Sequence, residues 1–301
     1  MKNNLSTLEV VLEGLMKRYS ERVPDVKKIT RAMIEEGVIA HESEIENDHV
    51  AFRTMGVKHL GIGSFEKIFL ALGYQKKDYF YFEGKKLDAY WFAPPEPRFP
   101  RIFVSELRVN DLSEGAQKII RSYTDEVTAA PVDPLDLTDG TAIDRFLHQP
   151  LWRTPEWADY EALLKESEYA AWVIYNRYYL NHYTISVHNL KEGYNTVAEF
   201  NAFLERTGIR LNDSGGKIKV SPDGGLLQSS TVAEMINARF ADDDLHTISG
   251  SYVEFAERKV LPEFAHLKPG EIKREHRREG FETGNADKIF ESTFISQTGR
   301  E

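Results

Sequence analysis

The chain has 301 residues, of which 41% are apolar, 29% charged and 12% aromatic, as in an ordinary globular protein with a sizeable core. Its 38 Lys and Arg residues against 48 Asp and Glu residues give a net charge of −10, so we expect no general nucleic-acid binding, which needs cationic surface. The sequence contains no cysteine, which excludes disulfides, a cysteine nucleophile, iron–sulfur clusters and thiolate zinc sites. Any metal must therefore be held by His, Asp or Glu.

Residues 1–45 predict a helical extension at the N-terminus. Leucines recur at helical spacing from Leu5 to Leu15 with charged residues between them, and this pattern lacks the uninterrupted apolar stretch of a secretion signal. No stretch of the sequence reaches the roughly 20 apolar residues that cross a bilayer. We therefore expect a cytoplasmic protein with no membrane partner.

Two segments of similar pattern follow, separated by an insert. Residues 46–110 predict a strand, a helix and three strands, and residues 177–260 repeat this order, with a loop at Asp242–Asp244 before the last strand. Residues 111–176 predict a helical and loop insert, and residues 261–301 a C-terminal tail. The repeat is one of pattern and not of literal sequence. It predicts a single α+β domain with two βαβββ modules, and leaves open the oligomeric state and whether the insert is a lid.

Polar side chains share faces of the predicted strands, because side chains alternate with a period of two. His49 and Arg53 share a face of the first strand of module one, while His182 and Glu254 lie on the first and last strands of module two. If these strands line a common cleft, His49, His182 and Glu254 converge, and two histidines with one carboxylate suit Fe(II) oxygen chemistry. A histidine on a strand is more often structural, and His188 shares the predicted face of His182. A structural role and a different ligand therefore both stay open.

Three other signals are weaker. Glu106 is the counterpart of Glu254 in the first module, and a structural hydrogen bond is favoured over a role in the site. The segment Asn212–Gly216 is similar to a serine-protease nucleophile region, but no companion histidine motif accompanies it. The glycines at 61 and 63 lack the third glycine of a dinucleotide site, so we expect Ser64 to cap a helix instead.

Three segments resemble the family of 2-oxoadipate dioxygenase/decarboxylases, within the vicinal-oxygen-chelate superfamily. They are Asp48–Thr54, Leu180–Thr184 and Tyr252–Arg258. The resemblance spans about residues 45–260, and Gly280–Thr293 is also similar to the family. It implies a vicinal-oxygen-chelate fold, in which two βαβββ modules form a pair of half-barrels around a divalent metal.

The resemblance implies a role for each matching residue. His49, His182 and Glu254 would be the metal ligands, and the implied cofactor is Fe(2+). Arg53 would hold a substrate carboxylate through its planar guanidinium, which lysine does not reproduce. Gln228 is a weaker candidate, which would offer its amide to the substrate. The implied partners are a small 2-oxo acid and O2.

The implied reaction is the oxidative decarboxylation and hydroxylation of a 2-oxo dicarboxylic acid. The best candidate is 2-oxoadipate from lysine breakdown, which would give 2-hydroxyglutarate and CO2. Two alternatives stay open. A metal-dependent isomerase or lyase of the same superfamily would prefer Mn, Ni, Co or Zn and need no O2. A non-catalytic module would bind a small acid tightly without turning it over.

Overall fold

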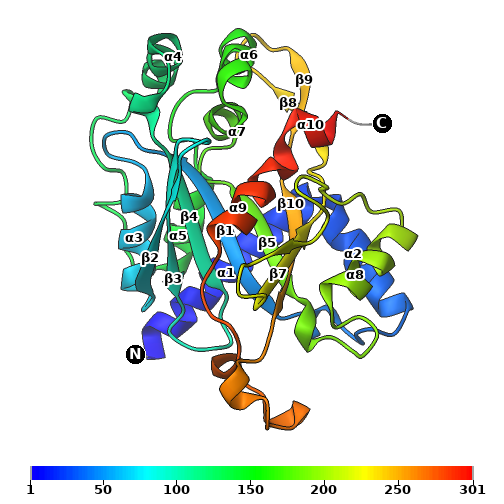
Figure 1. Cartoon of the computed structure of the whole chain (residues 1–301). Coiled ribbons are helices and arrows are strands. Elements are labelled where there is room, and N and C mark those ends of the chain that lie inside the picture. Colours follow the sequence, from blue (N-terminus) through cyan, green and yellow to red (C-terminus); the bar gives the residue numbers. More distant parts are fainter. Residues whose placement is uncertain (1, 300–301) are drawn as a thin grey trace.

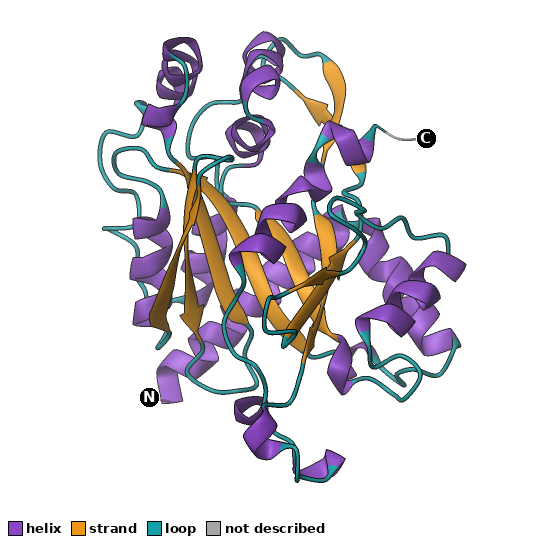
Figure 2. Ribbon diagram, viewed as in Figure 1, coloured by secondary structure: helices purple, strands orange, loops and turns teal. Residues whose placement is uncertain are grey.

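The computed structural model describes residues 2–299, which form a curled central sheet covered by helices (Figures 1 and 2). The strands are β1 (Asn47–Met55), β2 (Gln75–Phe82), β3 (Leu87–Ala93), β4 (Arg101–Leu107), β5 (Leu180–Ser186), β6 (Lys219–Val220), β7 (Leu226–Ser230), β8 (Met235–Arg239), β9 (Leu245–Ser249) and β10 (Tyr252–Arg258). The α-helices are α1 (Lys2–Arg22), α2 (Pro24–Glu35), α3 (Ile62–Ala71), α4 (Glu114–Thr124), α5 (Gly140–His148), α6 (Trp157–Glu166), α7 (Glu168–Asn176), α8 (Val197–Arg206), α9 (Thr283–Phe290) and α10 (Ile295–Thr298).

The order of the central sheet, β2-β3-β4-β1-β5-β10-β7-β6, joins the two modules at their first strands. β1 pairs in parallel with β4 and antiparallel with β5, and β5 pairs in parallel with β10. One module is β1-α3-β2-β3-β4 and the other is β5-α8-β6-β7-β10. The predicted α+β fold with two βαβββ modules is confirmed, and it places β1, β5 and β10 side by side.

These three central strands are buried on both faces. Every residue of β5 and β10, and every residue of β1 after Asn47, is buried. Helix α1 lies behind the sheet, whereas the tail carries α9 across its front (Figures 1 and 2). Because water reaches neither face, polar side chains on these strands need partners among themselves or in a ligand.

The N-terminal extension and the insert are helical, as their patterns predict. Pro24 occupies the first turn of α2, where its missing N–H has no cost. Within the insert, α7 packs against β1 and brings Tyr169 and Trp172 over Arg53, with ring centroids 5.3 and 5.4 Å from its guanidinium carbon. Among residues 2–299 no helix has both the length and the apolar character needed to cross a membrane.

Two elements differ from the sequence prediction. Residues 235–249 form a β8–β9 hairpin with Asp242–Asp244 between its strands, where we expected a loop. The hairpin is half exposed and has only Ala238 and Ile248 buried on its strands, so its apolar alternation is too weak to be read. Helix α3 begins at Ile62 and not after Ser64, because Glu106 Oε2 accepts the Ile62 N–H at 2.8 Å.

Candidate metal centre

Three buried side chains meet where β1, β5 and β10 lie side by side. His49, His182 and Glu254 each offer one ligand atom, and these atoms lie within 4.8 Å of one another. Glu254 Oε2 is 3.0 Å from His182 Nε2, and its Oε1 is 3.4 Å from His49 Nε2. None of the three residues is more than 5% exposed. The structure thus brings together the three residues that the sequence predicts as ligands.

The sheet register explains why these residues converge. Thr184 of β5 pairs with His49 on one neighbouring strand and with Glu254 on the other. His182 lies two residues before Thr184 and therefore faces the same side of β5. The Thr184 hydroxyl lies 3.0 Å from His49 Nε2, at the centre of the group. A register shift of one residue would turn the histidines away from Glu254.

Each histidine is oriented by the residue that precedes it. His49 Nδ1 lies 2.8 Å from Asp48 Oδ1, and His182 Nδ1 lies 3.0 Å from Asn181 Oδ1. With Nδ1 engaged, each ring turns its Nε2 to the centre, which is how metal-binding histidines are commonly held. Two such nitrogens and one carboxylate on one side of a site fit Fe(II), leaving its other coordination positions open.

The ionisation of the three side chains also suits a divalent cation. Burial acts to raise the pKa of Glu254, but the charge of His49 and the hydrogen bond to His182 outweigh it and lower this pKa to about 2. Burial lowers the pKa of His182. Burial acts in the same direction on His49, but the charge of Glu254 and the hydrogen bond to Asp48 raise the pKa of His49. The Glu254 charge thus favours a cation at this position, and a bound metal would take the place of a proton on His49.

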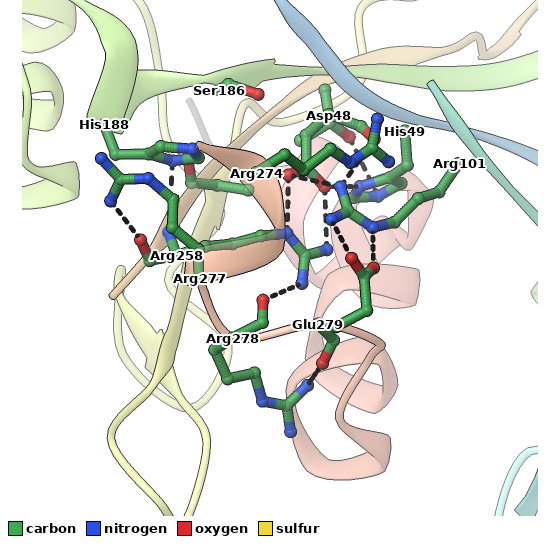
Figure 3. Close-up of polar contacts among 12 residues, drawn as sticks. Asp48, His49, Arg101, Ser186, His188, Arg258, Arg274, Arg277, Arg278 and Glu279 are labelled. Carbon is green, nitrogen blue, oxygen red and sulfur yellow. Dashed lines mark hydrogen bonds and ion pairs between the residues drawn. The ribbon is translucent and has the colours of Figure 1, made fainter. Parts of the chain in front are cut away.

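Asp48 connects His49 to a group of arginines (Figure 3). Arg258 donates to both carboxylate oxygens of Asp48, at 2.7 and 2.9 Å, and Arg101 Nη1 donates to Oδ2 at 3.2 Å. Arg101 also forms a two-pronged ion pair with Glu279. Burial acts to raise the pKa of Asp48, but the charges of Arg258 and Arg101 hold it well below its ordinary value. Asp48 is therefore an ionised acceptor for the His49 ring.

Gln228 of β7 lies against the ligands. Its Nε2 donates to Glu254 Oε1 at 2.6 Å, and its Oε1 accepts from Asn285 Nδ2 of α9 at 3.0 Å. This arrangement orients the Glu254 carboxylate. The Gln228 amide also lines a small cavity beside the three ligands, which is described below. It is therefore within reach of a substrate bound there.

A small cavity of about 20 Å³ lies beside the three ligands. Its apolar walls come from β4, β10 and the tail, and include Phe103, Tyr252, Phe281, Ile289 and Phe290. This volume holds a water molecule or an ion. A six-carbon diacid needs several times more space, so the tail side chains must move to admit one.

Arg53 lies on the same side of β1 as His49, four residues further along the strand. Its Nη1 donates to Thr293 Oγ1 at 2.8 Å, and its Nη2 donates to the Phe290 carbonyl at 2.9 Å. No carboxylate of residues 2–299 forms an ion pair with it, and its Nε and the Tyr252 hydroxyl are buried with no partner in hydrogen-bond geometry. A buried guanidinium is costly without an anion, so this position suits a substrate carboxylate.

His188 and Glu106, the two other residues that the sequence offered for a role in the site, lie outside it. β5 ends at Ser186, and His188 falls in a 3-10 turn, where its Nδ1 lies 3.2 Å from the Arg258 N–H nitrogen. The turn breaks the period-two alternation on which the shared face with His182 depended. Glu106 accepts the first N–H of α3 and takes the favoured structural role.

The sequence prediction missed the residues that support the ligands. Asp48 and Asn181 precede the two histidines, but strict alternation places adjacent residues on opposite faces of a strand. The β1–β5 pairing shifts register between Asn47 and His49, which relaxes this alternation. Phe281, Ile289 and Phe290 of the tail were also missed, because their segment is far from the strands in sequence. The available signals were an aspartate or asparagine directly before each histidine, and the similarity of Gly280–Thr293 to the family.

Comparison with known proteins decides the family. Residues 11–268 match the family model of 2-oxoadipate dioxygenase/decarboxylase. The chain belongs to this family. A chloroplastic 2-oxoadipate dioxygenase/decarboxylase from Arabidopsis thaliana is 47% identical over 264 residues, which is 84% of this chain and 69% of that protein. The crystal structure of the hydroxyglutarate synthase from Oryza sativa in complex with 2-oxoadipate has a TM-score of 0.91 and 40% identity, covering 100% of this chain and 96% of that one.

The fold extends to more distant proteins. A glyoxalase-superfamily protein from Ralstonia eutropha has a TM-score of 0.70 at 21% identity, covering 94% of this chain and 86% of that one. At this identity the likeness concerns the fold alone. It agrees with the predicted vicinal-oxygen-chelate architecture.

The expected cytoplasmic location is wrong. The Arabidopsis family member is chloroplastic, and a rice member, 42% identical over 98% of this chain and 81% of its own length, is chloroplastic/amyloplastic. Location depends on targeting signals that import receptors recognise, and not on the charge or hydropathy of a folded domain. The amphipathic N-terminal pattern therefore carried no information about the compartment.

Proposed function

We propose that this chain is an Fe(II)-dependent enzyme that converts 2-oxoadipate and O2 to 2-hydroxyglutarate and CO2, as a step in lysine breakdown. The observation that carries the proposal is the convergence of His49, His182 and Glu254 within 4.8 Å, in a member of a family named for this substrate. Bound Fe(II) would supply O2 activation and two adjacent positions for the oxygens of a 2-oxo acid.

The protein's own contribution is orientation, charge and the exclusion of water. Asp48 and Asn181 hold the two imidazole rings, and Gln228 holds the Glu254 carboxylate. The aromatic walls of the cavity keep bulk water from the reacting atoms, which strengthens electrostatic interactions there.

Arg53 would bind the far end of the substrate. Arg53 lies four residues after His49, which is about 13 Å along a strand. The long Arg53 side chain and the His49 ring can both lean toward each other, so the guanidinium can lie closer to the metal position than this. With the 2-oxo acid group at the metal, the remaining carboxylate of 2-oxoadipate would point toward Arg53 Nε and the Tyr252 hydroxyl, two buried polar atoms without a hydrogen-bond partner. This arrangement would select a dicarboxylate over a monocarboxylate.

The reaction itself is the direct test. Purified protein loaded with Fe(II) under argon should consume one O2 and release one CO2 for each 2-hydroxyglutarate formed from 2-oxoadipate. An oxygen electrode and mass spectrometry of the product measure both. His182→Ala should be inert in the same assay. Loaded protein that consumes no O2 with any of a panel of 2-oxo acids would contradict the proposal, and turnover with Mn, Ni, Co or Zn without O2 would favour an isomerase or lyase.

Arg53→Lys should reduce kcat/KM for 2-oxoadipate by about 10- to 100-fold and leave metal content unchanged. The reason is that lysine keeps the charge but loses the two-pronged geometry, which is worth about 1.5–3 kcal/mol. A substrate without the second carboxylate, 2-oxohexanoate, serves as the matched control. The wild type should strongly prefer 2-oxoadipate, and the variant should lose most of that preference. An equal preference in both proteins would remove Arg53 from substrate recognition.

A further inference from the structure

A second, larger cavity lies at the edge of the sheet where β1 and β4 begin and β5 and β10 end. It measures about 420 Å³. The segment between Val260 and Arg278 folds beneath this edge and forms the opposite wall (Figure 1, orange). A bridge between Val260 and Arg277 anchors this segment to the end of β10.

The wall of this cavity is strongly cationic, although the chain as a whole carries a net charge of −10. Six cationic side chains and two carboxylates, Glu46 and Asp48, line it. The cations are Arg98, Arg101, Arg258, Lys273, Arg274 and Arg277. From outside this lining, Glu9 and Glu96 pair with Arg98, and Glu279 pairs with Arg101. Like charges that remain unpaired in a partly buried space raise the free energy of the fold unless an anion offsets them.

Two of the arginines lack a carboxylate partner among residues 2–299. Arg274 Nη1 donates to the carbonyls of Pro97 and Phe99 at 2.6 and 2.7 Å, whereas its Nη2 is buried and meets no hydrogen-bond acceptor. Arg277 Nη1 donates to the Arg258 carbonyl at 2.8 Å, an uncharged acceptor. Both guanidinium groups therefore have donors to offer to a ligand.

Figure 3 shows the guanidinium groups of Arg101, Arg258 and Arg274 gathered around Asp48, and Arg277 beside His188. Glu279 pairs with Arg101 in the same group, so two carboxylates face the guanidinium groups of Arg101, Arg258, Arg274 and Arg277, and positive charge remains in excess. Burial, and after it the charge of Arg101, lower the pKa of Arg274 to about 10. The charges of Asp48 and Glu279 oppose this shift without cancelling it.

We propose that this cationic cavity binds a small phosphate monoester at a site separate from the metal centre. The guanidinium groups approach from strand ends and from the tail segment, and hence from several directions. A phosphate monoester has three terminal oxygens in a tetrahedral arrangement, whereas a carboxylate has two in one plane, so the phosphate accepts hydrogen bonds from guanidinium groups over a wider range of directions. The cavity exceeds the volume of a phosphate group and leaves room for a small organic part.

Asp48 separates the two sites. It accepts from His49 Nδ1, on the side of the ring away from the metal ligands, and from Arg258 on the side of the cationic cavity. A ligand in the cationic cavity therefore contacts arginines and not the metal. Its binding can be measured independently of turnover.

The test is a calorimetric titration of the Fe(II)-loaded protein with inorganic phosphate, the minimal probe, under argon at constant ionic strength set with chloride. Arg274→Gln combined with Arg277→Gln should weaken binding at least about tenfold. The matched control is Lys268→Gln, which neutralises an exposed cation of the same tail segment outside the cavity. Lys268→Gln should bind phosphate within about twofold of wild type.

Arg277→Gln alone provides a second test if the double variant folds poorly. This variant keeps the Arg274 contacts to Pro97 and Phe99, and it should also weaken phosphate binding.

Two further titrations locate the probe and define its chemistry. His182→Ala lacks a metal ligand and should still bind phosphate, whereas loss of binding in this variant alone would place the phosphate on the metal and overturn the proposal. Glutarate, a dicarboxylate without a 2-oxo group, should bind more weakly than phosphate. Tighter binding of glutarate, or equal phosphate binding by wild type and the arginine variants, would also overturn it.

Discussion

Glu254→Gln should lose bound Fe(II) and reduce turnover of 2-oxoadipate by at least about 100-fold. Glu254 is the one anionic ligand of the predicted three, and both of its oxygens face histidine nitrogens, at 3.0 and 3.4 Å. Glutamine has nearly the same shape but no charge, so packing survives while attraction for the cation is lost. Changes to residues that merely support a ligand cost about 10- to 100-fold, and a ligand itself should cost at least as much. Elemental analysis after anaerobic loading and oxygen uptake measure the two effects.

The same strand provides a matched control for this variant. Glu257 is also a buried glutamate of β10, but its carboxylate accepts the Val197 N–H at the start of α8 and pairs with Lys259. Glu257→Gln should therefore keep its iron and most of its activity. Equal iron content in Glu254→Gln and Glu257→Gln would show that Glu254 is not a ligand.

Asp48→Asn should destabilise the metal-free protein by about 3–5 kcal/mol, the range for breaking a buried ion pair. The substitution removes the carboxylate that Arg258 contacts with two nitrogens and Arg101 with one, and both guanidinium groups stay buried. It also weakens the acceptor for His49 Nδ1, so iron affinity should fall by about 10- to 100-fold. Urea unfolding and metal titration measure the two losses separately.

The pH dependence of the stability difference between wild type and Asp48→Asn provides a check. The pKa of Asp48 is depressed in the folded protein, so its stabilising effect is complete above its unfolded value, about 3.9, and is lost as pH falls toward the folded pKa. The part of the stability gap between wild type and Asp48→Asn that comes from the ionisation of Asp48 should therefore narrow only in acid. Because Asp48 also raises the pKa of His49, a second part of the gap should shrink as pH rises through the raised His49 pKa. A gap that does not narrow in acid would contradict the role of Asp48, because its own ionisation is lost only there.

Local patterns in the sequence were sufficient for the strands of both modules and for the candidate ligands. Alternation with a period of two is a property of single strands, and it marked His49, His182 and Glu254 as polar groups inside otherwise apolar strands. Where the alternation along a strand ended or was weak, the predicted faces and strands were wrong. His188 follows the end of β5, and the half-exposed β8–β9 hairpin has too little apolar alternation to be recognised.

Other features depend on contacts between segments that are distant in the chain. The small cavity gains its Phe281 and Phe290 walls, and the cationic cavity its tail wall, only when the tail folds across the strands. The composition of the tail does not say which face it covers.

The sequence by itself determined which side chains can bind a metal, because ligand chemistry and strand alternation are local properties. Only the tertiary structure decided that Asp48 and Asn181 orient the two histidines, and that Arg53 is buried without an anionic partner among residues 2–299. Orientation and charge balance depend on which strand edges and tail residues meet, and that is settled when the two modules pack through β1 and β5.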